Sequence, residues 1–81
     1  MRVRVLFFAG LRDLAGKREH EYTLDESSTL LDLHDRIHRD FPAMAGIEKK
    51  IRLAVNEEYA TLDRPLRDGD TVAMIPPVSG G

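Results

Sequence analysis

The sequence predicts an α+β fold in which one main helix covers one face of a four- to five-stranded sheet. Residues 2–8 alternate in character from one position to the next, which is the period of a strand with one buried face. Residues 28–41 repeat apolar side chains at helical spacing. Further short β-rich segments follow at 51–55, 59–61 and 71–75. Because a single helix cannot cover both faces of such a sheet, we expect the other face to lie open to solvent or to a partner.

The first strand, residues 2–8, has two faces of different character. One face carries only apolar, mostly β-branched or aromatic side chains, which favour strands: Val3, Val5 and Phe7. On the opposite face, Leu6 and Phe8 are apolar at one end of the strand. Together with Ile75 in the last strand, they predict an exposed apolar patch on the uncovered face of the sheet.

The segment LRDLAG predicts a short helical turn after the first strand. It should end at Gly16, because glycine accepts the left-handed backbone that commonly follows a helix. Residues 18–24 are then expected to return as a second strand, paired with the first in a hairpin, with His20, Tyr22 and Leu24 on one side. His20 is therefore interpreted as a strand residue and not as a catalytic one.

The long helix is predicted within SSTLLDLHDRIHRDFP, residues 27–42. Ser28 or Thr29 can cap its first turn, and Asp32 follows Thr29 by three residues, as in a capping box. Pro42 disfavours helical geometry at the residue before it, so the helix should end there. Residues 43–50 are predicted to be a linker that can contain another short turn. The positions at helical spacing predict a buried stripe: Leu30, Leu33, Ile37 and Phe41.

The rest of the domain is predicted to be three strands joined by turns. Residues 51, 53 and 55 of the third strand should face the same way, and Asn56 and Glu57 suit a tight turn before a short return strand at 59–61. The triplet Asp68-Gly69-Asp70 is typical of a turn, here leading into the last strand, 71–75. The chain therefore divides into a folded domain, residues 1–75, and an extended tail, residues 76–81.

Composition places the chain among ordinary globular proteins. It has 81 residues, of which 42% are hydrophobic and 32% charged, a balance that favours one domain with a modest core. With a net charge of -2 and scattered Lys and Arg, we expect neither nucleic acid nor an anionic membrane as the main partner. The apolar run at 5–11 is interrupted by Arg12 and Asp13, so it predicts neither a signal peptide nor a membrane span. We therefore expect a cytoplasmic protein.

The side chains give little indication of a catalytic centre. The chain has no cysteine, which excludes disulfides, thiolate metal sites and a cysteine nucleophile. His34 and His38 are four residues apart on the predicted helix, a spacing that can grip a metal, but no third ligand is evident and we expect no metal. Turn chemistry accounts for Asp68 and Asp70. We expect no active site within the domain itself.

The last seven residues, IPPVSGG, indicate a different kind of reactive group. Gly80 and Gly81 contribute no side-chain packing and have the widest backbone freedom. Pro76 and Pro77 keep the exit from the last strand extended. The six residues after Ile75 can reach about 20 Å, which is far enough to enter a neighbour's pocket. The sequence therefore predicts that the terminal carboxylate, on a flexible Gly-Gly tail, is the working group.

Three segments resemble the small, sulfur-carrying subunit of molybdopterin synthase: VLFFAGLRDLAG, LAVNEEY and PLRDGDTVAMIPPVSGG. They cover nearly half of the chain, and the last one is the most specific. The resemblance implies the ubiquitin-like β-grasp fold, with a mixed sheet. It also implies a sulfur carrier in molybdenum cofactor biosynthesis.

The resemblance implies a defined chemistry at Gly81. An E1-like adenylyltransferase uses ATP to make the glycyl adenylate, because a carboxylate needs a good leaving group before it can react. A sulfur donor system then replaces the adenylate, which leaves a thiocarboxylate (1-thioglycine) on Gly81. This sulfur passes to cyclic pyranopterin monophosphate in the active site of the large subunit, twice for each molybdopterin. The chain would thus act as the sulfurtransferase small subunit and bind no cofactor of its own, with Gly80 required for passage of the tail.

The resemblance also implies a heterotetramer, with two small subunits at opposite ends of a large-subunit dimer. Phe8 matches the aromatic position at the end of the first strand in the large-subunit interface. Arg12 matches an arginine in the following turn that contacts either the large subunit or the activating enzyme. The other residues expected to contact partners are Leu6, Ile75, Pro76, Pro77, Val78 and Ser79.

Other functions fit the same tail. A sulfur carrier for thiamine synthesis or tRNA thiolation also ends in Gly-Gly on a β-grasp domain, although the thiamine type is usually shorter and lacks the LRDLAG segment. A ubiquitin-like modifier would use the same adenylate to join Gly81 to lysines of target proteins. In a β-grasp binding module, by contrast, the terminal glycines would be dispensable.

Overall fold

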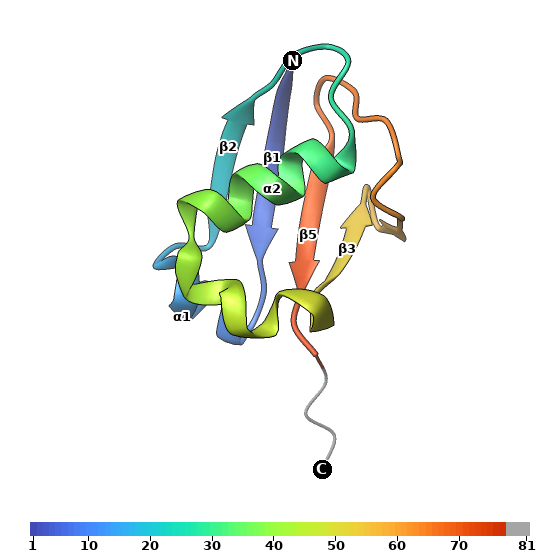
Figure 1. Ribbon diagram of the computed structural model, residues 1–81. Helices are drawn as coiled ribbons and strands as arrows, with labels where there is room; N and C mark the ends of the chain where they lie inside the picture. Colours follow the sequence, from blue (N-terminus) through green and yellow to red (C-terminus); the bar gives the residue numbers. More distant parts are fainter. Residues whose placement is uncertain (78–81) are drawn as a thin grey trace.

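The computed structural model describes residues 1–77 and shows a five-stranded mixed sheet with one long helix across one face (Figure 1). The strand order is β2-β1-β5-β3-β4. β5 pairs in parallel with β1 and antiparallel with β3, so the last strand of the chain lies at the centre of the sheet. The elements are β1 (Arg2–Phe7), α1 (Gly10–Ala15), β2 (Glu19–Thr23), α2 (Leu30–Asp40), the 3₁₀ helix η1 (Pro42–Lys50), β3 (Arg52–Val55), β4 (Glu58–Tyr59) and β5 (Thr71–Ile75).

The β1–β2 hairpin has the predicted faces. The buried face of β1 carries Val3, Val5 and Phe7, which are at most 1% exposed, while Phe8 follows the strand and is 41% exposed. α1 ends at Gly16, whose φ of 75° is the left-handed conformation that the sequence predicted. In β2, Tyr22 is buried and His20 half-buried, with their rings edge to face.

Helix α2 begins and ends where its caps predict. The backbone N–H and the hydroxyl of Thr29 both donate to the Asp32 carboxylate, at 2.8 and 3.2 Å. The helix ends at Asp40, and Pro42 follows Phe41, which has left the helical conformation. Of the predicted stripe, Leu30, Leu33 and Ile37 are fully buried and Phe41 is half-buried.

The linker predicted at 43–50 is wrong, because this segment belongs to the 3₁₀ helix η1. Pro42 starts the helix with a fixed φ, and Met44 anchors it by burying its whole side chain in the core. Its apolar signal is a single spacing of three residues, from Met44 to Ile47, both of which contact the core. Its structure depends on this contact with the rest of the fold and not on a local pattern.

The β3–β4 hairpin is shorter than predicted, but its turn is as expected. Asn56 and Glu57 have φ values of 50° and 72°, the left-handed pair that a two-residue hairpin turn requires. The return strand is Glu58–Tyr59, and not 59–61 as the sequence suggested. The turn before β5 contains Gly69 with a φ of 87°, where glycine avoids backbone strain.

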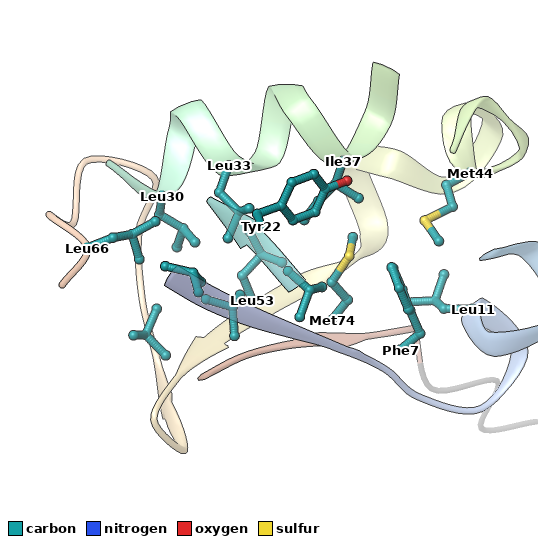
Figure 2. Close-up of a cluster of buried hydrophobic side chains, with 14 residues drawn as sticks. Phe7, Leu11, Tyr22, Leu30, Leu33, Ile37, Met44, Leu53, Leu66 and Met74 are labelled. Atoms are coloured by element: carbon teal, nitrogen blue, oxygen red, sulfur yellow. The ribbon is translucent and has the colours of Figure 1, made fainter. Parts of the chain in front are cut away.

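One hydrophobic core lies between the sheet and the two helices α2 and η1. Figure 2 shows the side chains of α2 pointing onto those of the sheet within this core. Phe7 and Phe41 close one end, with ring centroids 5.2 Å apart in an edge-to-face arrangement. Within residues 1–77, no helix has the length and apolar character needed to cross a membrane.

Candidate functional site

The strand that carries the C-terminal tail is the central strand of the sheet. Val72 and Met74 of β5 are fully buried, and β5 is hydrogen-bonded to strands on both sides. Pro76 is half-buried and Pro77 exposed beyond the end of this strand. Residues 78–81 lie outside the described residues, so the roles expected for Val78, Ser79, Gly80 and Gly81 stay predictions, as does the boundary between domain and tail.

The parallel pairing of β1 with β5 brings Phe8 to the base of the tail. Parallel strands end at the same edge of a sheet, and Figure 1 shows β1 and β5 pointing the same way. The Phe8 N–H donates to the carbonyl oxygen of Met74 at 3.3 Å, one residue before Ile75. Leu6 and Ile75 are half-buried and Phe8 is exposed. Phe8 is 41% exposed, so a large part of its ring is open to solvent.

A hollow of about 620 Å³ joins three of the predicted partner-binding residues. It is lined by Leu6, Phe8 and Arg12, together with Arg18 and Glu19 from the start of β2. Arg12 lies on α1 and is exposed. The apolar ring of Phe8 thus lies beside two cationic side chains, close to the strand that carries the tail.

The open face of the sheet extends the apolar patch beyond the predicted residues. Strand register places Leu6 beside Ala73, Ala73 beside Ala54, and Ala54 beside Tyr59. These four residues form a band across four strands, and Tyr59 is 60% exposed. The sequence did not reveal that Ala73 and Tyr59 lie on this face, where Ala54 between them is nearly covered, at 6% exposed. The signal was the alternation of β5, where Ala73 shares a face with Ile75.

Charged residues flank this band. On the β1–β2 side, ion pairs join Arg2 to Glu21 at 3.5 Å and Arg4 to Glu19 at 3.7 Å. On the β3–β4 side, the Arg52 guanidinium carbon lies 4.2 Å from the centroid of the Tyr59 ring, within cation–π range. An apolar centre with a charged rim is the usual composition of a protein–protein interface.

The two helix histidines lie together but do not form a metal centre. Their ring centroids are 4.4 Å apart, and an oxygen of Glu48 lies 3.9 Å from Nδ1 of His38. Burial, and then the neighbouring His34, lower the pKa of His38, while Glu48 and Asp35 act in the opposite direction. Among the described residues, no group of three metal-ligating side chains is arranged to hold an ion.

The remaining polar residues considered from the sequence have structural roles. Asp68 accepts a hydrogen bond from the Arg2 N–H at 2.7 Å. Asp70 accepts from the Asn56 amide at 2.9 Å and from the Arg67 N–H at 2.8 Å, which ties the β3–β4 turn to the turn before β5. These contacts hold the sheet together around the strand that carries the tail.

Relatives in sequence match the chain along nearly its whole length. The model of the ThiS family matches residues 5–81. The molybdopterin synthase sulfur carrier subunit of Chlamydomonas reinhardtii is 40% identical over 86 aligned positions, which cover 100% of both chains. The protein of the same name from Escherichia coli is 40% identical over 80 positions, covering 98% of this chain and 99% of the relative.

Solved structures have the same fold. The small archaeal modifier protein SAMP1 from Haloferax volcanii superposes with a TM-score of 0.90 at 29% identity and 100% coverage of both chains. A chain in the complex of subunits 1 and 2 of molybdopterin-converting factor from Helicobacter pylori superposes with a TM-score of 0.74 at 26% identity, again over 100% of both chains. The chain therefore belongs to the ThiS family, in the group of molybdopterin synthase sulfur carrier subunits, and has the ubiquitin-like β-grasp fold.

Proposed function

We propose that the protein carries sulfur on its C-terminal glycine for the synthesis of molybdopterin, as the small, sulfurtransferase subunit of molybdopterin synthase. The observation that carries this proposal is the full-length match to molybdopterin synthase sulfur carrier subunits. The position of β5 supports it as well, because a central strand gives the tail a rigid base. A rigid base fixes the point at which the chain leaves the sheet after Ile75.

The proposed chemistry needs no side chain of this protein. The Gly81 carboxylate attacks the α-phosphorus of ATP on an E1-like adenylyltransferase, and pyrophosphate leaves. Sulfide supplied by a donor system then displaces AMP and leaves a thiocarboxylate. The thiocarboxylate sulfur attacks cyclic pyranopterin monophosphate as a nucleophile, and water then cleaves the bond between this sulfur and the Gly81 carbonyl carbon, which restores the carboxylate. The absence of cysteine from the chain is compatible with this route, because sulfur is held on the main-chain carboxyl group.

The proposed docking surface for the large subunit is the end of the sheet from which the tail leaves. Phe8 and Arg12 lie there in one hollow, with Leu6, and Ile75 is the last residue of the central strand. Pro76 and Pro77 would guide the tail out of the sheet. Support for a large-subunit partner comes from the Helicobacter pylori structure, which is a complex of subunits 1 and 2 of molybdopterin-converting factor.

A second candidate function is that of a ubiquitin-like protein modifier. It is favoured by the likeness to SAMP1, which is named a small archaeal modifier protein. A modifier and a sulfur carrier both begin with the adenylate of Gly81, so the tail alone does not separate them. The difference appears after activation, when either sulfur or a lysine amine displaces AMP.

Intact mass spectrometry tests the proposal directly. The protein is incubated with an E1-like adenylyltransferase, ATP and a sulfur source. We expect a mass gain equal to the exchange of one oxygen for one sulfur, located on Gly81. Higher-mass conjugates without this gain would support the modifier instead. As a control, the enzyme must activate a known sulfur carrier in the same assay. If the mass of the protein does not change with that enzyme, both functions are contradicted.

A further inference from the structure

The side-chain amine of Lys17 lies against a histidine ring at the edge of the sheet. Its Nζ is 3.1 Å from Nδ1 of His20. Lys17 is exposed in the bend before β2, and β2 is an edge strand. An ammonium group can only donate a hydrogen bond, so Nδ1 is the acceptor and the proton of the neutral ring is on Nε2. The lysine amine therefore has a base within reach of its proton.

The His20 ring is oriented by two aromatic side chains. Its centroid is 4.7 Å from that of Tyr22 and 5.8 Å from that of Phe41, and both contacts are edge to face. Tyr22 is buried, and Phe41 packs edge to face on Phe7 of the core. A nucleophile beside a base that is itself held by a third group is the arrangement that activates nucleophiles in covalent catalysis.

Within residues 1–77, no other amine lies against an imidazole ring. The other two lysines, Lys49 and Lys50, are exposed at the end of η1. In this part of the chain, no hydrogen bond or ion pair involves their Nζ atoms. The N-terminal amine of Met1 donates to the Leu24 carbonyl oxygen at 2.8 Å and lies 3.4 Å from the Glu26 carboxylate. These three amines are internal controls for the reactivity of Lys17.

An amine with a neighbouring base reacts with an activated acyl group. The glycyl adenylate of the proposed function is such a group. The lone pair of Nζ attacks the Gly81 carbonyl carbon, the new C–N bond forms, the bond from this carbon to the phosphate oxygen breaks, and AMP leaves with the electron pair. The proton passes from Nζ to Nδ1 of His20 and then to water. The product is an isopeptide bond, and the step needs no oxidant or reductant.

The position of Lys17 favours the tail of a second copy as the acyl donor. Because β2 is at the edge of the sheet, another molecule can approach Lys17 from solvent. The chain's own tail starts from β5, on the other side of β1, and α1 joins β1 to β2 at this same end of the sheet (Figure 1). A tail of the same chain would therefore have to turn back past α1.

From these contacts we propose that Lys17 is a conjugation site, where the glycyl adenylate of a second copy forms an isopeptide bond with His20 as the general base. This inference rests on the proposed function in one respect, since it requires the adenylation of Gly81. It adds a second fate for the adenylate when sulfur is not supplied. Sulfide and the Lys17 amine compete for the same carbonyl carbon.

Intact mass spectrometry of a sulfur-free reaction tests the site. The protein is incubated with an E1-like adenylyltransferase and ATP, and pyrophosphate release is measured in parallel to report adenylation. We expect a product with the mass of two chains less one water. Digestion with trypsin should give a branched peptide in which residues 68–81 are joined to Lys17. Added sulfide should reduce the yield of this product.

Three variants separate the roles of the side chains. Lys17→Arg keeps the charge but lacks the amine, so the product should fall at least tenfold. Lys49→Arg/Lys50→Arg is the matched control and should stay within twofold of wild type. His20→Gln should slow the reaction at least tenfold, because the amide accepts a hydrogen bond from Lys17 but does not take its proton. Pyrophosphate release and the melting temperature are measured for each. If His20→Gln is unstable, the exposed Lys17→Arg still decides the test.

Several results would overturn the proposal. Pyrophosphate release by wild type without a branch at Lys17 would exclude this conjugation site. A product with the mass of one chain less one water would exclude a second copy as the donor. Equal rates for wild type and His20→Gln would exclude His20 as the base. No pyrophosphate release with an enzyme that adenylates a known sulfur carrier would contradict the proposed function itself, and this inference with it.

Discussion

His38 is a half-buried histidine whose two ring nitrogens are shielded from solvent. Its side chain is 10% exposed, and neither ring nitrogen has a hydrogen-bond partner within the described residues. A charged imidazolium at this position would lose hydration without a close partner to replace it, so the folded protein favours the neutral ring. The His34 ring beside it adds to this preference, since two imidazolium groups would repel each other.

The lowered pKa of His38 predicts that the protein loses stability at mildly acidic pH. Its pKa is lowered in the folded protein, so the unfolded chain binds the proton more readily. The stability that neutral His38 contributes is therefore complete above about pH 6.5, the pKa of a histidine in the unfolded chain. It falls as the pH drops below this value. Between pH 7.5 and 5, the melting temperature should fall less for His38→Gln than for wild type.

His20→Gln serves as the control for this measurement, because it removes a histidine from the other side of the core. Comparison with His20→Gln shows whether the loss of any one histidine changes the pH dependence equally. A decline in His38→Gln as steep as that of wild type would mean that the acid sensitivity arises from other groups.

At the scale of elements, the turn before β5 connects several parts of the sheet. The Gly69 N–H donates to the carbonyl oxygen of Arg2 at 2.8 Å, and the Asp70 side chain binds Asn56 of the neighbouring turn. The turn therefore aligns β5 with β1 on one side and with the β3–β4 hairpin on the other. Gly69 has a φ of 87°, which other residues adopt only with strain.

Gly69→Ala should destabilise the protein by about 1–2 kcal/mol, the cost of a left-handed backbone for a residue with a Cβ. For a domain of this size, that lowers the melting temperature by roughly 4–8 °C per kcal/mol. Gly46→Ala is the matched control, because a Cβ meets no atom within 4 Å at either glycine and only Gly69 has a positive φ. Equal melting temperatures for both variants would mean that the turn relaxes to another conformation.

Elements with a strong local signal were predictable from the sequence, and those fixed by distant contacts were not. The alternation of Val3, Val5 and Phe7 and the cap at Thr29 act within a few residues, so β1 and α2 were placed nearly correctly. η1 was missed because its apolar signal is limited to Met44 and Ile47, a single spacing that is too short to indicate a helix. Tyr59 was missed as a surface residue because its place on the open face depends on pairing with Ala54 of β3.

At the scale of the whole molecule, the helix covers one face of the sheet and the other remains accessible. The accessible face carries the band from Leu6 to Tyr59, and its end near the tail carries Phe8. This arrangement separates two requirements, because the core face provides stability while the open face is available for partners. Substitutions on the open face should therefore affect binding more than folding.

Phe8→Asp should weaken binding to the large subunit about tenfold or more, because it replaces an apolar contact with a charge at the proposed interface. Leu31→Asp is the matched control, since Leu31 is similarly exposed, at 44%, but lies on the outer side of α2. Affinities and melting temperatures are measured for both. Unchanged affinity of Phe8→Asp would move the interface to another part of the surface.

Removal of Gly81 should abolish sulfur transfer and leave the melting temperature unchanged, because the core is formed by residues before the tail. Gly80→Ala should reduce activation or transfer far more than it changes stability. Molybdopterin formation and thermal unfolding are measured side by side. Sulfur transfer by the protein without Gly81 would refute the proposed chemistry.

The central position of β5 also has a consequence for biosynthesis. A nascent chain that has not yet reached Thr71 can form the β1–β2 and β3–β4 hairpins, but the strand that joins them is missing. Contacts between residues far apart in sequence complete the sheet, so the domain closes only after its last strand leaves the ribosome. Any molecule that has folded has therefore been translated at least as far as the base of the tail. Incomplete products would remain open to proteases and would not compete with intact carriers for the activating enzyme.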